Sequence, residues 1–253
     1  MSVALITGGA TGIGRGFANK LADQGYNLIL TSRNLENLAL AQKEIQNKYH
    51  VKVLIYVADI TNESARKSLY EYVENYPVSI VVNNAGIGYS QNFYEGDITK
   101  EQELIDLNIT AMQAIFKYYT KKFYDLKEGR IINVSSVAGF VPGPGAATYY
   151  ASKAYVTSLT RAVALETKHI KGLKIQAVCP GPTKSNFYLT SGTSKKYYKA
   201  NPDKVAQKTL ESKRTIVLPG FKNKMLHVLL KLFPTALTSR INYRIQKNMR
   251  KKA

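Results

Sequence analysis

Short apolar runs alternate with longer stretches of mixed polarity along most of the chain. Runs of this length predict buried strands, and the stretches between them are long enough for helices that bury one face. The alternation favours an α/β fold with a parallel, doubly wound sheet of the Rossmann-like kind. The predicted strands span residues 3–7, 27–34, 51–61, 78–86, 129–136, 174–183 and 214–220. The predicted helices include one long helix over 99–124 and a shorter one over 203–213.

The 253 residues suffice for one domain with a substantial core. We predict a single domain over residues 1–220, followed over 221–253 by a basic amphipathic helical extension that is broken at Pro234. Within the domain, residues 184–202 are polar with interspersed aromatic side chains, which is typical of a mobile cover over a cleft.

Five apolar residues near this cleft are candidates to line an apolar substrate pocket, although ordinary loop packing explains them equally well. They are Phe187, Tyr188, Leu189, Phe140 and Val141.

The positive charge of the chain is concentrated in its last quarter. The formal net charge is +19, and residues 195–253 hold 16 Lys and Arg against two acids. In the extension, apolar residues recur every four positions with basic residues between them. Such a helix lies on an anionic membrane surface, or packs on its own domain or on a partner subunit. The excess sits in one helical tail without a recognisable nucleic-acid-binding module, so we expect no nucleic acid partner.

The cysteine content and the first residues bear on location. The single cysteine, Cys179, lies in an apolar run and allows no internal disulfide, which fits a reducing compartment. The chain enters a strand pattern at once, so a secretory signal is not expected. The apolar stretch 225–233 is too short to span a bilayer. We expect a cytoplasmic protein, peripheral at a membrane if the extension binds lipid.

A glycine-rich turn follows the first predicted strand and opens a helix that ends near Gly25. Thr7, Gly8, Gly12 and Gly14 fit the spacing TGxxxGxG. Glycines let the backbone approach a pyrophosphate, and the helix N-terminus offers it free N–H groups. The position after a strand and before an amphipathic helix predicts phosphate binding.

The end of the second predicted strand indicates which dinucleotide is bound. An NAD site usually has a carboxylate there, but this chain has Ser32 and Arg33, and Arg15 lies in the glycine-rich loop. Two guanidinium groups and a hydroxyl favour a 2′-phosphate and therefore NADP(H). Asp59 ends the next strand, where it could accept from an adenine amino group or help cap the following helix near Thr61.

Two further strand ends carry small or polar residues suited to a cofactor that lies against backbone. The fourth predicted strand ends in Asn83, Asn84, Ala85 and Gly86, although an ordinary turn also explains this run. The sixth ends in Pro180, Gly181, Pro182 and Thr183. Ligands of doubly wound sheets bind beyond the carboxyl ends of the strands, where all these motifs fall.

The candidate catalytic residues are Ser136, Tyr149 and Lys153. Tyr149 and Lys153 are four apart, so they share a helix face, and a nearby ammonium lowers the pKa of a phenol. Such a phenol can exchange a proton with a carbonyl or alcohol oxygen, to which Ser136 offers a second hydrogen bond. Tyr150 is a rival, but the residue four positions on is Ala154.

The same tyrosine–lysine spacing occurs at Tyr118/Lys122 and Tyr243/Lys247, without a hydroxyl thirteen positions upstream. Both of these pairs are interpreted as solvated basic helix faces.

Taken in order, TGGATGIG, NNAG, Asn108, VSS, YYASK and PGP resemble the short-chain dehydrogenase/reductase family, in its compact single-domain, NADPH-preferring branch, over about residues 1–190. The resemblance implies a catalytic tetrad of Asn108, Ser136, Tyr149 and Lys153. In that family the tyrosine is the general acid or base, the lysine lowers its pKa and binds the nicotinamide ribose, the serine holds the substrate oxygen, and the asparagine main chain positions a relay water. The implied cofactor contacts are Gly8, Thr11, Gly12, Ile13, Gly14, Ser32, Arg33, Asp59, Asn84, Ala85, Gly86, Tyr149, Lys153, Pro180, Gly181 and Thr183.

We therefore expect an oxidoreductase that transfers a hydride between NADP(H) and a small-molecule carbonyl or secondary alcohol, apolar if the nearby aromatics line its site. No metal is expected. A homo-oligomer, dimer or tetramer, is expected, although the basic extension departs from the shorter members whose C-termini help form interfaces. The alternative is a nucleotide-binding sensor or scaffold without chemistry, against which the complete tetrad argues.

Overall fold

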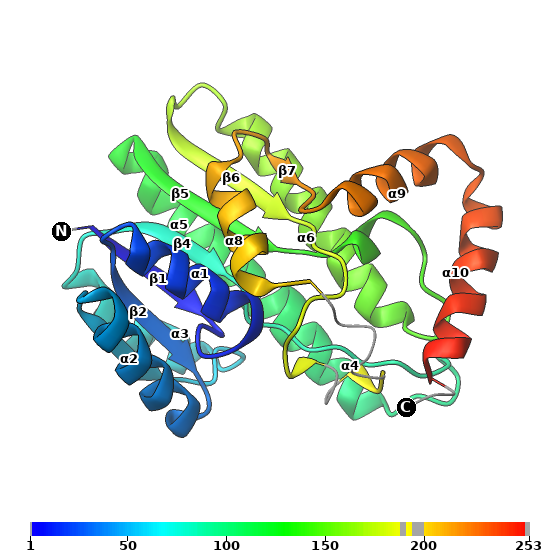
Figure 1. The fold of residues 1–253 in the computed structure, drawn as a ribbon, viewed down its shortest axis with the longest axis horizontal. Helices are drawn as coiled ribbons and strands as arrows, with labels where there is room; N and C mark the ends of the chain where they lie inside the picture. The colour runs from blue at the N-terminus through cyan, green and yellow to red at the C-terminus, as the bar shows by residue number, and fades with distance from the viewer. Residues whose placement is uncertain (1, 188–190, 194–199, 251–253) are drawn as a thin grey trace.

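A computed structural model describes residues 2–187, 191–193 and 200–250, and its centre is one parallel sheet (Figure 1). The strand order is β3-β2-β1-β4-β5-β6-β7, and every neighbouring pair is parallel. The order reverses between β1 and β4, so their carboxyl ends flank the crevice where doubly wound sheets bind ligands. The strands are β1 Val3–Thr7, β2 Asn27–Ser32, β3 Val53–Val57, β4 Val78–Asn83, β5 Glu128–Val134, β6 Gly172–Val178 and β7 Ile216–Val217. The predicted doubly wound α/β fold is confirmed.

The sheet is buried on both faces because successive side chains of a strand point to opposite sides. Val3 and Leu5 of β1 belong to one hydrophobic cluster, and Ala4 and Ile6 belong to the other. Three helices pack on each face. The first cluster includes side chains of α3 Glu63–Glu74, α5 Met112–Leu126 and α6 Ala147–Glu166. The second includes side chains of α1 Gly12–Asp23, α2 Leu35–Tyr49 and α8 Pro202–Glu211.

The long helix predicted over 99–124 is present but contains a local change of winding. It runs as α4 Ile98–Ile105, a π-helical segment Asp106–Ala111, and α5. Asp97 caps its start by accepting from the backbone N–H of Thr99 at 2.9 Å. A π segment widens the helix by one residue per turn and is frequent at functional sites. Asn108 lies inside this segment.

The chain ends in two helices, α9 Phe221–Leu232 and α10 Thr235–Arg250, with the break at Pro234 as predicted. A residue that precedes proline is disfavoured in helical geometry, and Phe233 is extended. In Figure 1 these helices occupy one end of the molecule and meet at a bend. We call α9, Phe233, Pro234 and α10 the C-terminal hairpin. Among the described residues, no helix has the length and apolarity needed to cross a membrane.

Candidate active site

The glycine-rich loop between β1 and α1 is held against the end of β4. Thr7 is fully buried, and its hydroxyl oxygen accepts from the backbone N–H groups of Asn84 at 2.9 Å and Ala85 at 3.0 Å. The Asn84 side-chain amide donates to the carbonyl oxygens of Thr7 and Gly8 at 2.9 and 3.1 Å. These bonds fix two neighbouring strand ends relative to one another. The side-chain amide of Asn84, an expected cofactor contact, is thus bonded to the glycine-rich loop.

The loop is shaped so that only glycine fits at key positions. Gly8 and Gly12 have φ of 63° and 56°, which disfavours any residue with a β-carbon. A β-carbon on Gly14 would lie 2.2 Å from the Gly8 carbonyl oxygen. The first helical residue of α1 is Gly12, so the free N–H groups of its first turn lie at this loop, a geometry suited to a phosphate. Thr11, the residue before α1, is exposed, and Ile13 is partly buried.

Arg33 and Asp59 stand at the ends of β2 and β3. The Arg33 side chain is 67% exposed, and its Nη1 lies 3.9 Å from Asp59 Oδ2. Burial acts to raise the pKa of Asp59, but hydrogen bonds from Thr61 and the charge of Arg33 outweigh it and hold that pKa below its usual value. The Ser32 hydroxyl makes a long bond to the Asn34 carbonyl oxygen.

Asp59 accepts from both the N–H and the hydroxyl of Thr61, at 3.0 and 2.7 Å. The cap of α3 is Asn62, which accepts from the N–H groups of Ser64 and Ala65. The alternative prediction is that Asp59 helps to cap this helix. Its side chain instead closes the turn that precedes α3, and Asn62 is the capping residue.

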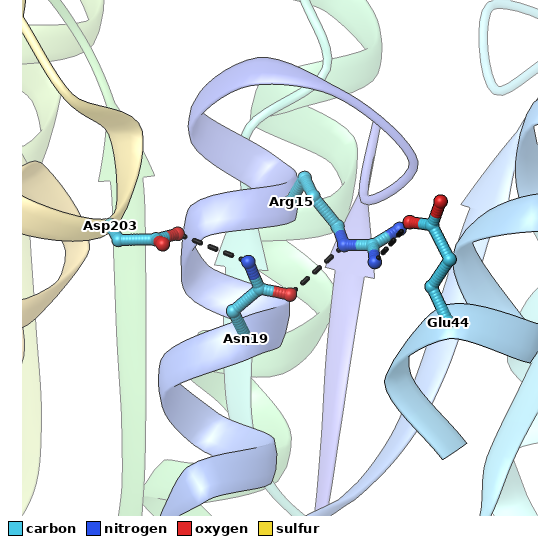
Figure 2. A network of polar contacts seen from close by, with 4 residues as sticks. All are labelled: Arg15, Asn19, Glu44 and Asp203. Carbon is cyan, nitrogen blue, oxygen red and sulfur yellow. Dashed lines mark hydrogen bonds and ion pairs between the residues drawn. The ribbon is translucent and has the colours of Figure 1, made fainter. Parts of the chain in front are cut away.

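Arg15, placed by the sequence beside a coenzyme phosphate, is part of a polar network (Figure 2). Its Nη2 lies 2.8 Å from Glu44 Oε2, and its Nε donates to Asn19 Oδ1 at 2.9 Å. Asn19 in turn donates to Asp203 Oδ1 at 3.1 Å. The network joins α2, α1 and α8, and its members Asn19, Glu44 and Asp203 were not expected from the sequence. The guanidinium of Arg15 is thus shared, whereas that of Arg33 is mostly solvent-exposed.

Tyr149 and Lys153 lie one turn apart on α6, beside the end of β5. The Lys153 Nζ atom lies 5.8 Å from the centre of the Tyr149 ring and donates to the Val134 carbonyl oxygen at 3.1 Å. Ser136, two residues after Val134, caps a short 3-10 helix, Val137–Phe140, and its hydroxyl accepts from the Ala138 N–H at 3.1 Å. The structure thus brings the end of β5 and the first turns of α6 together at the same edge of the sheet.

Burial lowers the pKa of Lys153 to about 8, because its ammonium loses most of its hydration and only 6% of the residue is exposed. Nearby Cys179 is buried as well, and the same desolvation raises the pKa of its thiol to about 11. The thiol is therefore neutral at physiological pH. An amine with a pKa of about 8 readily exchanges a proton in that range.

Asn108 is 1% exposed, and its side chain is fully used. Its Oδ1 accepts from the Ile87 N–H, and its Nδ2 donates to the Ile87 carbonyl oxygen, both at 2.9 Å, and to Ser152 Oγ at 3.2 Å. A β-carbon on Gly86 would lie 2.9 Å from Asn108 Oδ1 and 3.4 Å from Lys153 Nζ. Gly86, Asn108 and Lys153 therefore lie close together in the folded chain.

The start of the predicted cover lies over this site. The Phe187 ring centre is 5.4 Å from that of Tyr149, and a β-carbon on Gly88 would lie 2.4 Å from Phe187 Cζ. A β-carbon on Gly12 would lie 2.7 Å from Ser185 Cβ, so the cover also reaches the glycine-rich loop. The predicted pocket residues Tyr188 and Leu189 lie outside the described residues.

The loop after β6 connects the site to the C-terminal hairpin. Thr183 is buried, and its hydroxyl donates to the Gly181 carbonyl oxygen at 2.8 Å. A β-carbon on Gly181 would lie 2.7 Å from Asn223 Oδ1 of α9. Pro180 contributes its carbonyl oxygen to the N–H of Val137 at 3.0 Å. The predicted contacts at Pro180, Gly181 and Thr183 thus lie where α9 meets the domain.

An apolar cavity of about 320 Å³ separates the hairpin from the loop after Ser136. Its walls are Val137, Ala138, Val141 and Tyr150 from the domain and Leu226, Leu229, Leu230, Phe233, Leu237, Thr238, Ile241, Asn242 and Ile245 from the hairpin. Val141, one of the candidate pocket residues, lines this apolar cavity, whereas the Phe140 ring packs on His227 with centres 4.2 Å apart. No local pattern in the sequence indicates this cavity, because its two walls lie far apart along the chain.

The rival tyrosines have other partners. The Tyr150 hydroxyl contacts Asn242 Oδ1 at 3.4 Å and accepts from the Gln246 side chain of α10. Tyr118 stacks on Tyr70 with ring centres 3.9 Å apart, and its hydroxyl donates to Glu74. The expectation of a solvated face is thus wrong for Tyr118, which is half-buried in an aromatic stack.

The described residues contain no group of three or more His, Cys, Asp or Glu side chains that could hold a metal ion.

Comparisons with known proteins agree with this geometry. A sequence model of the short chain dehydrogenase family matches residues 2–195. A 17-beta-hydroxysteroid dehydrogenase type 3 from Mus musculus is 30% identical over 244 residues, covering 95% of this chain and 77% of that protein. An inactive hydroxysteroid dehydrogenase-like protein 1 from Homo sapiens is 33% identical over 183 residues, covering 70% of this chain and 54% of that protein.

Two solved structures show the same fold. A short-chain dehydrogenase from Sphingobium yanoikuyae in complex with NADPH has a TM-score of 0.84 at 26% identity, with 94% of this chain and 95% of that chain covered. A short chain dehydrogenase/reductase from Burkholderia phymatum in complex with NAD also has a TM-score of 0.84, at 21% identity, with 91% and 92% covered.

Proposed function

Because this chain belongs to the short-chain dehydrogenase family, we propose that it interconverts a carbonyl and a secondary alcohol with NADP(H) as coenzyme. The observation that carries the proposal is a buried lysine, its pKa lowered to about 8, one helical turn from a tyrosine at the crevice of a doubly wound sheet. Such a pair can exchange a proton with a substrate oxygen near neutral pH.

The glycine-rich loop fits a dinucleotide. Gly14 lets the first turn of α1 pack directly against the Gly8 carbonyl. The N–H groups of that turn have no partner within the helix, so they are available to a phosphate at this loop. When bound, the coenzyme supplies or accepts the hydride. Residues of the loop, with Thr11 and Ile13, would hold its phosphates, and Ala85 and Gly86 would face its nicotinamide half.

Preference for the 2′-phosphate rests on Ser32 and Arg33. No carboxylate ends β2, and the guanidinium of Arg33 is mostly solvent-exposed, so it could turn to a 2′-phosphate without breaking a buried ion pair. Arg15 would reach the same phosphate only by leaving Glu44. Asp59 would accept from the adenine amino group.

In this mechanism Tyr149 donates a proton to, or accepts one from, the substrate oxygen, and Ser136 holds that oxygen with a hydrogen bond. Lys153 stabilises the phenolate by its positive charge, which is strong at short range in a buried site. Asn108 is a positioning residue, because its side chain is hydrogen-bonded to Ile87 and Ser152. Its main chain, in the π segment, would hold a relay water beside Lys153.

The substrate class we propose is a carbonyl compound with a bulky apolar part. The cavity has apolar walls that include Val137 and Tyr150, the sequence neighbours of Ser136 and Tyr149. A site of this kind selects ligands mainly by buried apolar area. The mouse relative is named for a hydroxysteroid, a molecule of that class.

The test is NADPH oxidation, followed by absorbance, with a panel of ketones from small to bulky and apolar. Tyr149→Phe is expected to lower kcat at least about 10³-fold while coenzyme affinity changes little. Tyr155→Phe is the matched control, because Tyr155 lies on the same helix with its hydroxyl on exposed Gln113, and it should keep near-normal turnover. Near-normal turnover in Tyr149→Phe would overturn the assignment.

A second candidate function, coenzyme binding without chemistry, has one observation in its favour, the human relative named inactive. The presence of Asn108, Ser136, Tyr149 and Lys153 argues against it. Under this alternative the protein binds NADPH but does not oxidise it in the presence of any ketone, and Tyr149→Phe leaves every measured property unchanged.

We also propose a homo-oligomer, dimer or tetramer, located in a reducing compartment where the buried Cys179 stays a free thiol. Light scattering during size-exclusion chromatography tests the first point, and a monomeric mass at micromolar concentration would contradict it.

A further inference from the structure

Helix α9 carries two separate apolar stripes. One stripe lines the cavity described above. The other, which we call the outer stripe, consists of Phe221, Met225, Val228 and Leu232. These positions recur at intervals of four, three and four, so they lie on one helix face. Their exposed fractions are 79%, 50%, 53% and 73%, which means that among the described residues nothing covers this face.

Helix α10 separates its residues in a similar way. Leu237, Ile241 and Ile245 line the cavity. Arg240, Arg244 and Lys247 fall at intervals of four and three on a different face, and all three are exposed. We call these three residues the basic face. The apolar side of the helix therefore borders the cavity, with Leu237, Ile241 and Ile245 still 46%, 50% and 51% exposed, and the row of cations faces solvent.

The charge of this region is entirely of one sign. Residues 221–253 contain nine Lys and Arg and no Asp or Glu. Lys222 and Lys224, which are exposed, flank the start of the outer stripe. An exposed apolar stripe whose neighbouring charges are all positive is complementary to a surface with an apolar interior and negatively charged groups above it.

We propose that the C-terminal hairpin docks the protein onto an anionic lipid surface. The outer stripe enters the boundary between headgroups and acyl chains, and the basic face lies on the lipid phosphates. A second copy of the chain is a poorer occupant, because a two-fold interface would place this all-cationic region against itself. The proposal does not depend on the catalytic one, since it concerns residues outside the active site.

The test is sedimentation of the full chain with vesicles of phosphatidylcholine alone or with about 30% phosphatidylserine, at low and high salt. We expect binding to the anionic vesicles only, weakened by salt. The variants Met225→Ser/Val228→Ser/Leu232→Ser and Arg240→Glu/Arg244→Glu/Lys247→Glu should each lower the partition coefficient at least about tenfold. The control Lys117→Glu/Lys168→Glu/Lys171→Glu makes the same charge change at exposed positions elsewhere and should alter binding less than about twofold.

Thermal unfolding and size-exclusion mass of every variant show that it is folded and in the same assembly. Three outcomes would overturn the proposal. The first is equal binding to neutral and anionic vesicles, or none to either. The second is an equal loss in the control, which would assign binding to net charge alone. The third is dissociation of an oligomer by the serine variant with vesicle binding intact, which would make the outer stripe a contact between copies.

Discussion

The ammonium of Lys153 lies 5.8 Å from the centre of the Tyr149 ring and bonds to the carbonyl of Val134, the last residue of β5. The lysine thus links the helix that carries the tyrosine to the strand that precedes Ser136. Because the Lys153 ammonium is buried, it loses hydration, and this loss lowers its pKa. The contribution of Lys153 to stability therefore depends on pH.

Burial lowers the pKa of Lys153 from 10.5 to about 8 in the folded protein. Between these values the unfolded chain holds a proton that the folded protein has released, so this residue makes the free energy of unfolding rise with pH. Replacement by methionine in Lys153→Met removes the effect. The wild type should therefore gain about 2 kcal/mol relative to Lys153→Met between pH 7 and 9.5.

Urea unfolding at several pH values between 7 and 9.5 measures this difference, with Lys117→Met, an exposed lysine on α5, as control. A difference between wild type and Lys153→Met that does not change with pH would contradict the prediction. Loss of the bond to Val134 does not interfere, because that loss is the same at every pH.

Removal of Arg33 should weaken NADPH far more than NADH. In Arg33→Ala the charged hydrogen bonds to a 2′-phosphate are lost, and we expect the Kd of NADPH to rise about 10- to 100-fold with little change for NADH. Protein stability should change little, because the Arg33–Asp59 contact is exposed and 3.9 Å long. Fluorescence titration measures both coenzymes, with Lys48→Ala on α2 as control. Equal weakening of both would place Arg33 elsewhere in the site.

Much of the fold was predictable because a parallel sheet buries both faces, so its strands are nearly continuous apolar runs. β1 is buried at all five positions, and its sequence VALIT shows this directly. The glycine-rich loop and the Tyr149–Lys153 pair were also predictable, since their geometry is local: a turn, and one turn of helix.

The contacts that sequence reasoning missed join residues far apart in the chain. Arg15 pairs with Glu44, 29 residues away, and Asn19 bonds to Asp203, 184 residues away. The amide of Asn84 turns to Thr7, 77 residues away. Such pairs depend on how helices and strands pack, which no local spacing encodes. The π segment around Asn108 was missed for a related reason, because a single extra residue in a helical turn hardly changes the hydrophobic period.

Tyr119→Phe should stabilise the protein slightly. Tyr119 is fully buried, and within the described part of the chain its hydroxyl has no hydrogen-bond partner. The same burial raises the pKa of Tyr119 well above its usual value. Removing an unsatisfied buried hydroxyl should raise the free energy of unfolding by about 1 kcal/mol. Tyr118→Phe, which loses a bond to Glu74, is the matched comparison and should not be stabilising. Thermal unfolding measures both, and a lower Tm for Tyr119→Phe would show that its hydroxyl is satisfied.

Tyr150→Phe should loosen α10 from the domain without loss of the fold. The Tyr150 hydroxyl contacts Asn242 and Gln246, and Asn242 also donates to the Pro142 carbonyl oxygen at 2.9 Å. These polar contacts stand beside a cavity that gives the hairpin little packing, so each supports a large share of its attachment. Loss of two of them should lower the local stability of α10 by about 1–1.5 kcal/mol. Amide hydrogen exchange in α10 should therefore become about tenfold faster.

Exchange in β1 and β4, which lie in the core, should stay unchanged in Tyr150→Phe. Tyr155→Phe, whose hydroxyl donates to Gln113 of α5, is the matched variant. Unchanged exchange in α10 would mean that the hairpin is held by its apolar contacts alone. In that case the polar residues of α10 that face Tyr150 would contribute little to holding the helix on the domain. Asn242→Ala should then also leave amide exchange in α10 unchanged. Faster exchange only in α10 would instead show that the bonds to Tyr150, the neighbour of Tyr149, attach the extension beside the active site.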